Sequence, residues 1–202
     1  LLIPALPALP WPWLLRWLAW GLRGATIDAD FSRGLGQGLV ASALITMNIS
    51  VLRQICRPHG IALARFGWSE TGCQLLRRHL NWFLWIGPLS VAIIRLCETQ
   101  SDTWYSDTLG RTMFCIGAAA LTALLWQALN PKQPLLAGLA TSGAKVVWRL
   151  RYVWYPLIAG SHVVLAALAL TGYYYTALQL RDRLTLTGWL LLSAVLFINL
   201  FL

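Results

Sequence analysis

Charged residues are scarce in this sequence, and acidic residues are the scarcest of them. Only 11% of the 202 residues are Asp, Glu, Lys or Arg, whereas an ordinary soluble domain carries about 25%. By contrast, 58% of the residues are hydrophobic, and the mean hydropathy is +0.62. A fold of this size in water could not bury so much apolar surface. The composition therefore excludes a soluble domain and predicts an all-α, polytopic membrane protein, because backbone groups in lipid must bond within their own helix.

The sequence also lacks a metal-binding or redox motif. Its four cysteines stand too far apart for a C-x-x-C pair or a zinc site: they are Cys56, Cys73, Cys97 and Cys115. We therefore expect reduced, structural thiols, and predict neither a metal nor a cofactor.

No catalytic constellation is present either. His59 and His79 share one connection with a single carboxylate, Glu70. General acid–base chemistry needs a base that a partner orients, and no such group stands beside them. We predict that the chain is not an enzyme and has no catalytic residues.

The formal charge of +9 raises the question of a nucleic-acid partner. Nucleic-acid binding needs basic residues clustered on one solvated face. Here the basic residues stand between apolar runs, so no nucleic-acid partner is predicted.

The apolar runs have lengths close to the roughly 20 residues that a membrane-spanning helix needs. About six spans are predicted, at residues 1–22, 35–52, 80–96, 112–129, 152–171 and 184–202. Four prolines, at positions 4, 7, 10 and 12, should leave the first half of the first run kinked or non-helical. The pair Gly87-Pro88 predicts a kink in the third run and is a candidate flex point.

The distribution of charge predicts an orientation. Nine basic residues lie in two of the five connections: Arg53, Arg57, Arg65, Arg77 and Arg78, then Lys132, Lys145, Arg149 and Arg151. Six of the seven acidic residues fall on the other side: Asp28, Asp30, Glu98, Asp102, Asp107 and Asp182. By the positive-inside rule, the two basic connections are cytoplasmic. An even number of spans then places both visible ends on the cytoplasmic side.

The basic connections have two interpretations. Positive charge that fixes the topology is the simpler one. The second is that arginines hold anionic lipid headgroups at the inner leaflet, where each contributes about 1 kcal/mol. The candidate headgroup contacts are Arg53, Arg57, Arg77, Arg78, Arg149 and Arg151.

Two further features invite a functional interpretation but favour a structural one. Gly34, Gly36 and Gly38 resemble a phosphate-binding loop, yet no strand precedes them. Gly34 and Gly38 are better explained as small residues that let two helices approach closely. His162 lies deep in the fifth run, where no acidic residue could relay a proton, so we expect a neutral histidine that bonds to a neighbouring helix.

The chain begins at Leu1 and stops within an apolar run. We expect it to be a fragment of a longer protein.

Several runs resemble a known family. They are Phe66-Gly67-Trp68, Leu76–Leu84, and above all Arg149–Leu157 together with Leu168–Leu178. From about Leu35 to the end, the chain is similar to the N-terminal membrane domain of the large bacterial MscS-like mechanosensitive channels, of which the potassium-dependent and miniconductance branches both fit.

The resemblance implies a fragment of a channel that opens under bilayer tension and releases ions during osmotic downshock. It implies the bacterial inner membrane, identical subunits in a homoheptamer, contact with membrane lipids, and a peripheral, paddle-like helix array. The pore would lie outside this chain, since Gly117–Ala120 is too short a small-residue run to form it.

Another class stays open as an alternative, namely a secondary transporter or a membrane-enzyme subunit. A transporter should show broken helices whose polar groups meet near the bilayer midplane. In this sequence only His162 is a strongly polar residue deep within a predicted span.

Overall fold

The computed structural model is helical throughout the part of the chain that it describes, which comprises residues 10–22, 29–57, 69–100, 103–128 and 151–201. Its elements are α1 (Pro10–Leu22), α2 (Ala29–Ile55), α4 (Glu70–Thr99), α5 (Thr103–Tyr105), the π-helical turn η2 (Ser106–Gly110), α6 (Arg111–Ala128), α9 (Arg151–Leu170) and α10 (Tyr174–Phe201). The expected all-α fold class is confirmed.

Among the residues that the structure describes, three helices are long and apolar enough to cross a membrane: Asp30–Ile55, Glu70–Thr99 and Asp107–Ala128. Pro156–Leu170 is a shorter apolar helix. The described part of the first predicted span is α1, whose 13 residues extend over about 20 Å. The prolines at positions 4 and 7 lie outside the described residues, and α1 begins at Pro10, where the missing N–H of proline costs nothing.

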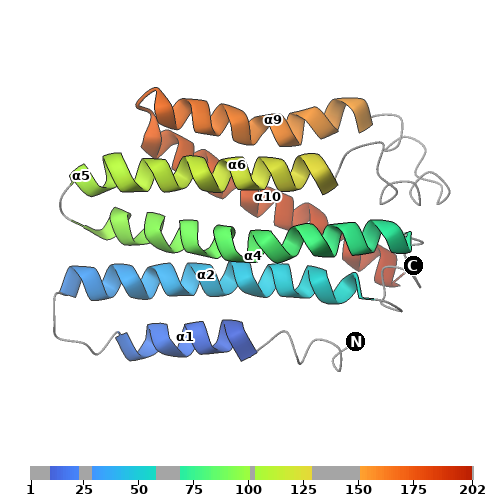
Figure 1. Cartoon of the computed structure of the whole chain (residues 1–202), viewed down its shortest axis with the longest axis horizontal. Coiled ribbons are helices and arrows are strands. Elements are labelled where there is room, and N and C mark those ends of the chain that lie inside the picture. The colour runs from blue at the N-terminus through green and yellow to red at the C-terminus, as the bar shows by residue number, and fades with distance from the viewer. Residues whose placement is uncertain (1–9, 23–28, 58–68, 101–102, 129–150, 202) are drawn as a thin grey trace. The chain divides into compact units, whose positions relative to one another are not determined.

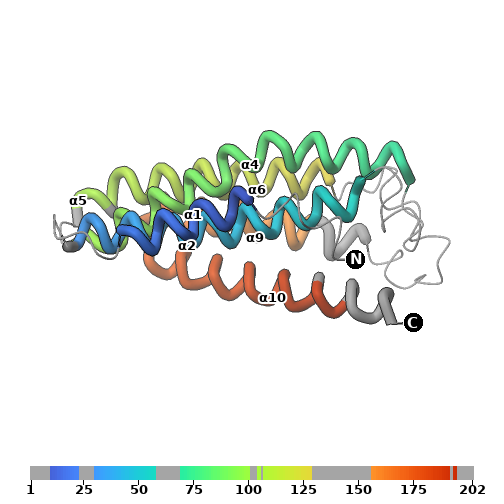
Figure 2. Tube along the Cα trace, turned by 90° about the horizontal axis from the view of Figure 1, so that it is seen from below, coloured from blue at the N-terminus to red at the C-terminus, as the bar shows by residue number. Residues whose placement is uncertain are grey.

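Two helices begin well before the apolar runs that predicted them. Helix α4 starts at Glu70 because Ser69 caps it, since the Gly72 N–H donates to Ser69 Oγ at 3.1 Å. Helix α10 starts at Tyr174 and continues through Arg181 and Asp182 as one unbroken helix (Figure 2). Polar residues at the ends of the runs thus remain helical.

The chain divides into two compact units, Leu1–Ile55 with Arg78–Leu121, and Cys56–Arg77 with Thr122–Leu202. In the first unit, α1, α2, α4 and the beginning of α6 lie side by side in chain order (Figure 1). Close approaches at glycines join the neighbours. A Cβ at Gly36 of α2 would lie 3.6 Å from the Ala19 carbonyl oxygen of α1, and one at Gly117 of α6 would lie 2.9 Å from Ser90 Oγ of α4.

In the second unit, α9 and α10 form a helical hairpin (Figure 1). The turn is a Schellman motif, in which the Tyr173 N–H donates to the Leu168 carbonyl at 3.0 Å and the Gly172 N–H donates to the Ala169 carbonyl at 3.4 Å. Gly172 has a φ of 103°, a backbone conformation that glycine adopts without strain. The hairpin therefore depends on this glycine.

Candidate functional site

Large apolar side chains are exposed on many of the described helices. Trp85 is 78% exposed, Leu157 is 70% exposed, and Leu191 is 69% exposed. Four tryptophans of α1 are likewise exposed: Trp11, Trp13, Trp17 and Trp20. Surfaces of this kind are unfavourable in water and suit contact with lipid.

Two glycines of α2 lie in close contact with α4. A Cβ at Gly38 would lie 2.7 Å from the Ala92 carbonyl oxygen and 3.2 Å from the Ala92 Cα, so the two backbones touch. A Cβ at Gly34 would collide with Thr99 Oγ1. The prediction that Gly34 and Gly38 permit close helix approach is confirmed, and we call this contact the α2–α4 seam.

The seam runs antiparallel, because Gly34 faces the end of α4 whereas Ser42 faces its middle. There the buried Ser42 hydroxyl donates to the Pro88 carbonyl at 2.7 Å. Pro88 lies inside α4, which is helical on both sides of it. The Ser90 hydroxyl donates back to the Gly87 carbonyl at 2.9 Å. The candidate flex point therefore lies at the seam, with hydroxyl groups bonded to its carbonyls.

The structure describes the backbone of five of the six residues predicted to contact headgroups. Arg53 is half-buried near the end of α2 and Arg57 is exposed just beyond it. Arg77 is half-buried and Arg78 exposed in the first turns of α4. Arg149 lies outside the described residues, and Arg151 opens α9. Their contact with lipid stays a prediction.

Cys56 and Cys73 are brought together although 17 positions separate them in the sequence, and both are buried. Burial and, to a smaller extent, the neighbouring Cys73 raise the pKa of the Cys56 thiol to about 12, against an opposing effect of Arg77. All four cysteines are free. Sequence reasoning missed this pair because nothing in the spacing of two cysteines 17 positions apart indicates that they lie together. Within the described residues, no group of His, Cys, Asp and Glu could hold a metal ion.

Comparison with known proteins assigns the chain to a family. The family description "Mechanosensitive ion channel inner membrane domain 1" matches residues 1–202. The chain belongs to this family. No curated protein and no solved structure matches it. The family explains why the apolar helix faces are uncovered, because the domain lies in a membrane.

In this mechanosensitive-channel membrane domain, His162 does not bond to the neighbouring helix that the sequence analysis expected. Its Nδ1 lies 3.1 Å from the Ile158 carbonyl oxygen and 3.3 Å from Ser161 Oγ, both in its own helix α9. The expected bond to a neighbouring helix is thus replaced by a bond one turn back. The arrangement is structural, as the sequence indicated.

Proposed function

We propose that this domain is the peripheral, tension-sensing region of a mechanosensitive ion channel that opens under bilayer tension and releases ions during osmotic downshock. In the proposal, the domain crosses the bacterial inner membrane six times, with both basic connections in the cytoplasm. Identical subunits assemble around the pore as a homoheptamer. The chain itself contributes the sensor rather than the gate.

The proposal is supported by the family to which the domain belongs and by the α2–α4 seam. A sensor must collect force over a wide lipid-facing surface and pass it on through rigid contacts. The exposed apolar faces supply the first property. The seam supports the second, because two backbones in contact at Gly38 cannot slide apart without breaking the packing.

Bilayer tension favours whichever conformation occupies more area in the membrane plane. A helix array that tilts or spreads under tension gains area, so tension shifts the population toward the expanded state. Gly87 and Pro88 are the proposed flex point, since proline removes one backbone hydrogen bond from α4. Arginines at the basic connections are the proposed anchors to the inner leaflet.

The test is patch-clamp recording of the full-length parent protein in membranes of a channel-deficient bacterium while suction is stepped. The proposal predicts openings that rise steeply with tension, and a higher threshold once residues 1–202 are deleted. Silence up to lytic tension, together with substrate uptake into proteoliposomes, would contradict the channel and favour the transporter.

A further inference from the structure

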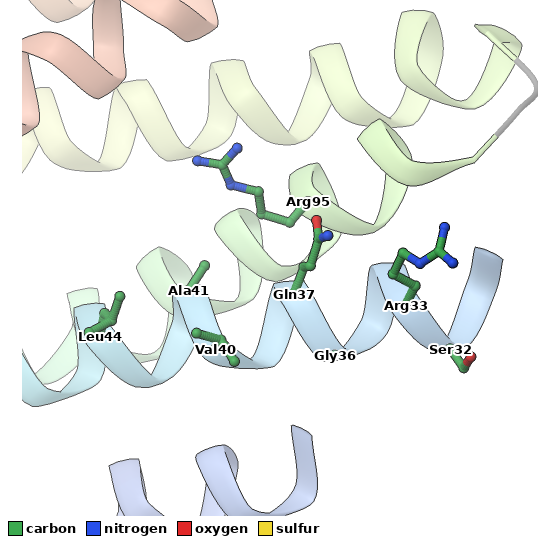
Figure 3. A pocket seen from close by; sticks show the side chains of 8 residues that line it. All are labelled: Ser32, Arg33, Gly36, Gln37, Val40, Ala41, Leu44 and Arg95. Atoms are coloured by element: carbon green, nitrogen blue, oxygen red, sulfur yellow. The ribbon is translucent and has the colours of Figure 1, made fainter. Parts of the chain in front are cut away.

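The groove beside the seam does not combine its charges into one anion site. It has a volume of about 370 Å³ and is lined by seven residues of α2 and by Arg95 of α4. Figure 3 shows the guanidinium groups of Arg33 and Arg95 pointing toward different ends of the groove, with that of Arg95 directed away from α2. Arg95 Nη1 also donates to Glu98 Oε2 at 2.9 Å. A more distinctive chemistry lies in the second unit, at two cysteines.

Cys56 and Cys73 are neighbouring free thiols that both belong to the second unit. Both are deeply buried, with exposed fractions of 2% and 1%. Burial raises the pKa of both thiols, and the hydrogen bond between their side chains adds to this effect at Cys56 and opposes it at Cys73. In that bond Cys56 is therefore the donor and Cys73 the acceptor. One thiol of the pair keeps its proton, while the anion of the other is stabilised.

The surroundings of Cys73 also favour its anion. Cys73 closes the first turn of α4, where its N–H donates to the Ser69 carbonyl at 3.0 Å. The positive end of a helix dipole stabilises a thiolate at such a position. Arg77 follows one turn later, and its charge opposes the effect of burial on the pKa of Cys56. Glu70, the acidic residue of the first turn, is exposed to solvent, which screens its opposing charge.

We infer that Cys56 and Cys73 form a redox-sensitive pair, which a peroxide oxidises to a disulfide. The Cys73 thiolate attacks one oxygen of hydrogen peroxide and breaks the O–O bond, which yields Cys73 sulfenic acid and hydroxide. The Cys56 sulfur then attacks the Cys73 sulfur, and the hydroxyl group leaves with the Cys56 proton as water. Hydroxide takes up the proton that Cys73 released, so one peroxide becomes two waters.

The disulfide joins the residue that follows α2 to the first turn of α4, across 17 positions of the sequence. A bridge of this kind limits how far the two joined segments can separate. In the proposed orientation this connection faces the cytoplasm, where the thiol pool keeps cysteine pairs reduced. The pair is therefore a dithiol at rest and becomes a disulfide when peroxide accumulates.

The test uses the full-length protein in isolated membranes. The membranes are treated with hydrogen peroxide, unfolded with N-ethylmaleimide present and digested with trypsin without reduction. Trypsin places the two cysteines on separate peptides, 54–65 and 66–77, because it does not cleave between Arg57 and Pro58. Mass spectrometry should find these peptides joined with the loss of two hydrogen atoms, and dithiothreitol should separate them. The readout does not depend on channel opening or on orientation, so the tension-sensing proposal stands or falls separately.

Cys97 is the internal control, because it is nearly as buried, with an exposed fraction of 3%. The described structure pairs it with no second thiol, so it should be recovered as its maleimide adduct. Recovery of both Cys56 and Cys73 as maleimide adducts would overturn the proposal. So would disulfide links to Cys97 in a yield equal to that of the 56–73 link.

Two variants test the roles of the two thiols. Cys56→Ser removes the thiol that resolves the sulfenic acid, so peroxide should leave Cys73 as a sulfenic acid that dimedone traps when the protein is unfolded in its presence. Cys73→Ser removes the nucleophile, so Cys56 should give no dimedone adduct. Equal trapping in the two variants, or trapping at Cys56 alone, would overturn the assignment. The wild-type disulfide tests the pair without any substitution, so the result does not depend on how well a variant folds.

Discussion

At the scale of single residues, Gly172 determines whether the chain can reverse between α9 and α10. Its φ of 103° is costly for any residue with a Cβ, by about 1–2 kcal/mol. We expect Gly172→Ala to lower the thermal unfolding temperature of the domain by several degrees, measured by circular dichroism in detergent, because each kcal/mol corresponds to about 2–4 °C in a chain of this length.

Gly160 provides the matched control for this substitution. It lies within α9, and a Cβ added there would meet nothing within 4 Å. Gly160→Ala should therefore leave the unfolding temperature unchanged or raise it slightly, because alanine favours a helix over glycine by about 1 kcal/mol. Equal effects of the two substitutions would contradict the role assigned to the turn.

The Cys56 thiol should be unreactive at neutral pH. Its pKa is raised from an ordinary value of 9.0 to about 12, chiefly by burial, and only the thiolate attacks a maleimide. We expect alkylation of Cys56 by N-ethylmaleimide, followed by peptide mass spectrometry, to stay slow from pH 7 to pH 9. An exposed cysteine introduced next to it, Arg57→Cys, should react faster and accelerate with pH.

The same shift predicts how stability depends on pH. Because the folded pKa of Cys56 lies above the unfolded value, the thiol's contribution is complete below about pH 9 and is lost as pH rises toward 12. Rapid labelling of Cys56 in the folded protein at pH 7 would show that the thiol is accessible and contradict this account.

At the scale of elements, the stiffness of α4 can be altered by a single substitution at Pro88. Pro88→Ala restores a backbone N–H in its interior and removes the ring that disturbs the preceding turn. If Gly87-Pro88 is a flex point, a stiffer α4 should raise the tension needed for opening, with a change of about 0.5–2 kcal/mol in the opening equilibrium. Patch-clamp recording with stepped suction measures this threshold.

Helix α9 supplies the control, because Pro156 also lies inside a helix. Pro156→Ala should leave the threshold near its wild-type value. A threshold that Pro88→Ala leaves unchanged would exclude the flex-point role, although Ser42 would still bond to the carbonyl of residue 88.

Which contacts between elements the sequence could predict depends on how local their signals are. Gly34 and Gly38 predicted the close approach of α2 to another helix, because two small residues four positions apart share one helix face. The hydrogen bond from Ser42 to the Pro88 carbonyl had no such signal, since it depends on the antiparallel register of α2 against α4. The start of α4 at Glu70 was missed because hydropathy alone ignores Ser69, whose hydroxyl caps the helix.

At the scale of the whole molecule, the predicted orientation can be tested with a membrane-impermeant maleimide in a background without native cysteines. Arg65→Cys lies in a basic connection, and Asp102→Cys lies in an acidic one. The positive-inside rule predicts that Asp102→Cys is labelled in cells with an opened outer membrane, whereas Arg65→Cys is labelled only in inverted vesicles.

The reverse labelling pattern would show that the whole domain has the opposite orientation to the one predicted. Residues 65 and 102 flank a single predicted span, 80–96. Labelling of both positions from the same side would show that an even number of spans separates them, which would contradict this prediction.

The central claim is that the α2–α4 seam passes tension from the lipid-facing helices toward the pore. Its most direct test is the opening threshold of full-length channels that carry Gly38→Ala, recorded under stepped suction beside Gly160→Ala. The added Cβ at residue 38 must displace the Ala92 backbone, whereas the one at residue 160 meets nothing. The account predicts a raised threshold for Gly38→Ala alone. Identical thresholds in wild type and both variants would contradict it.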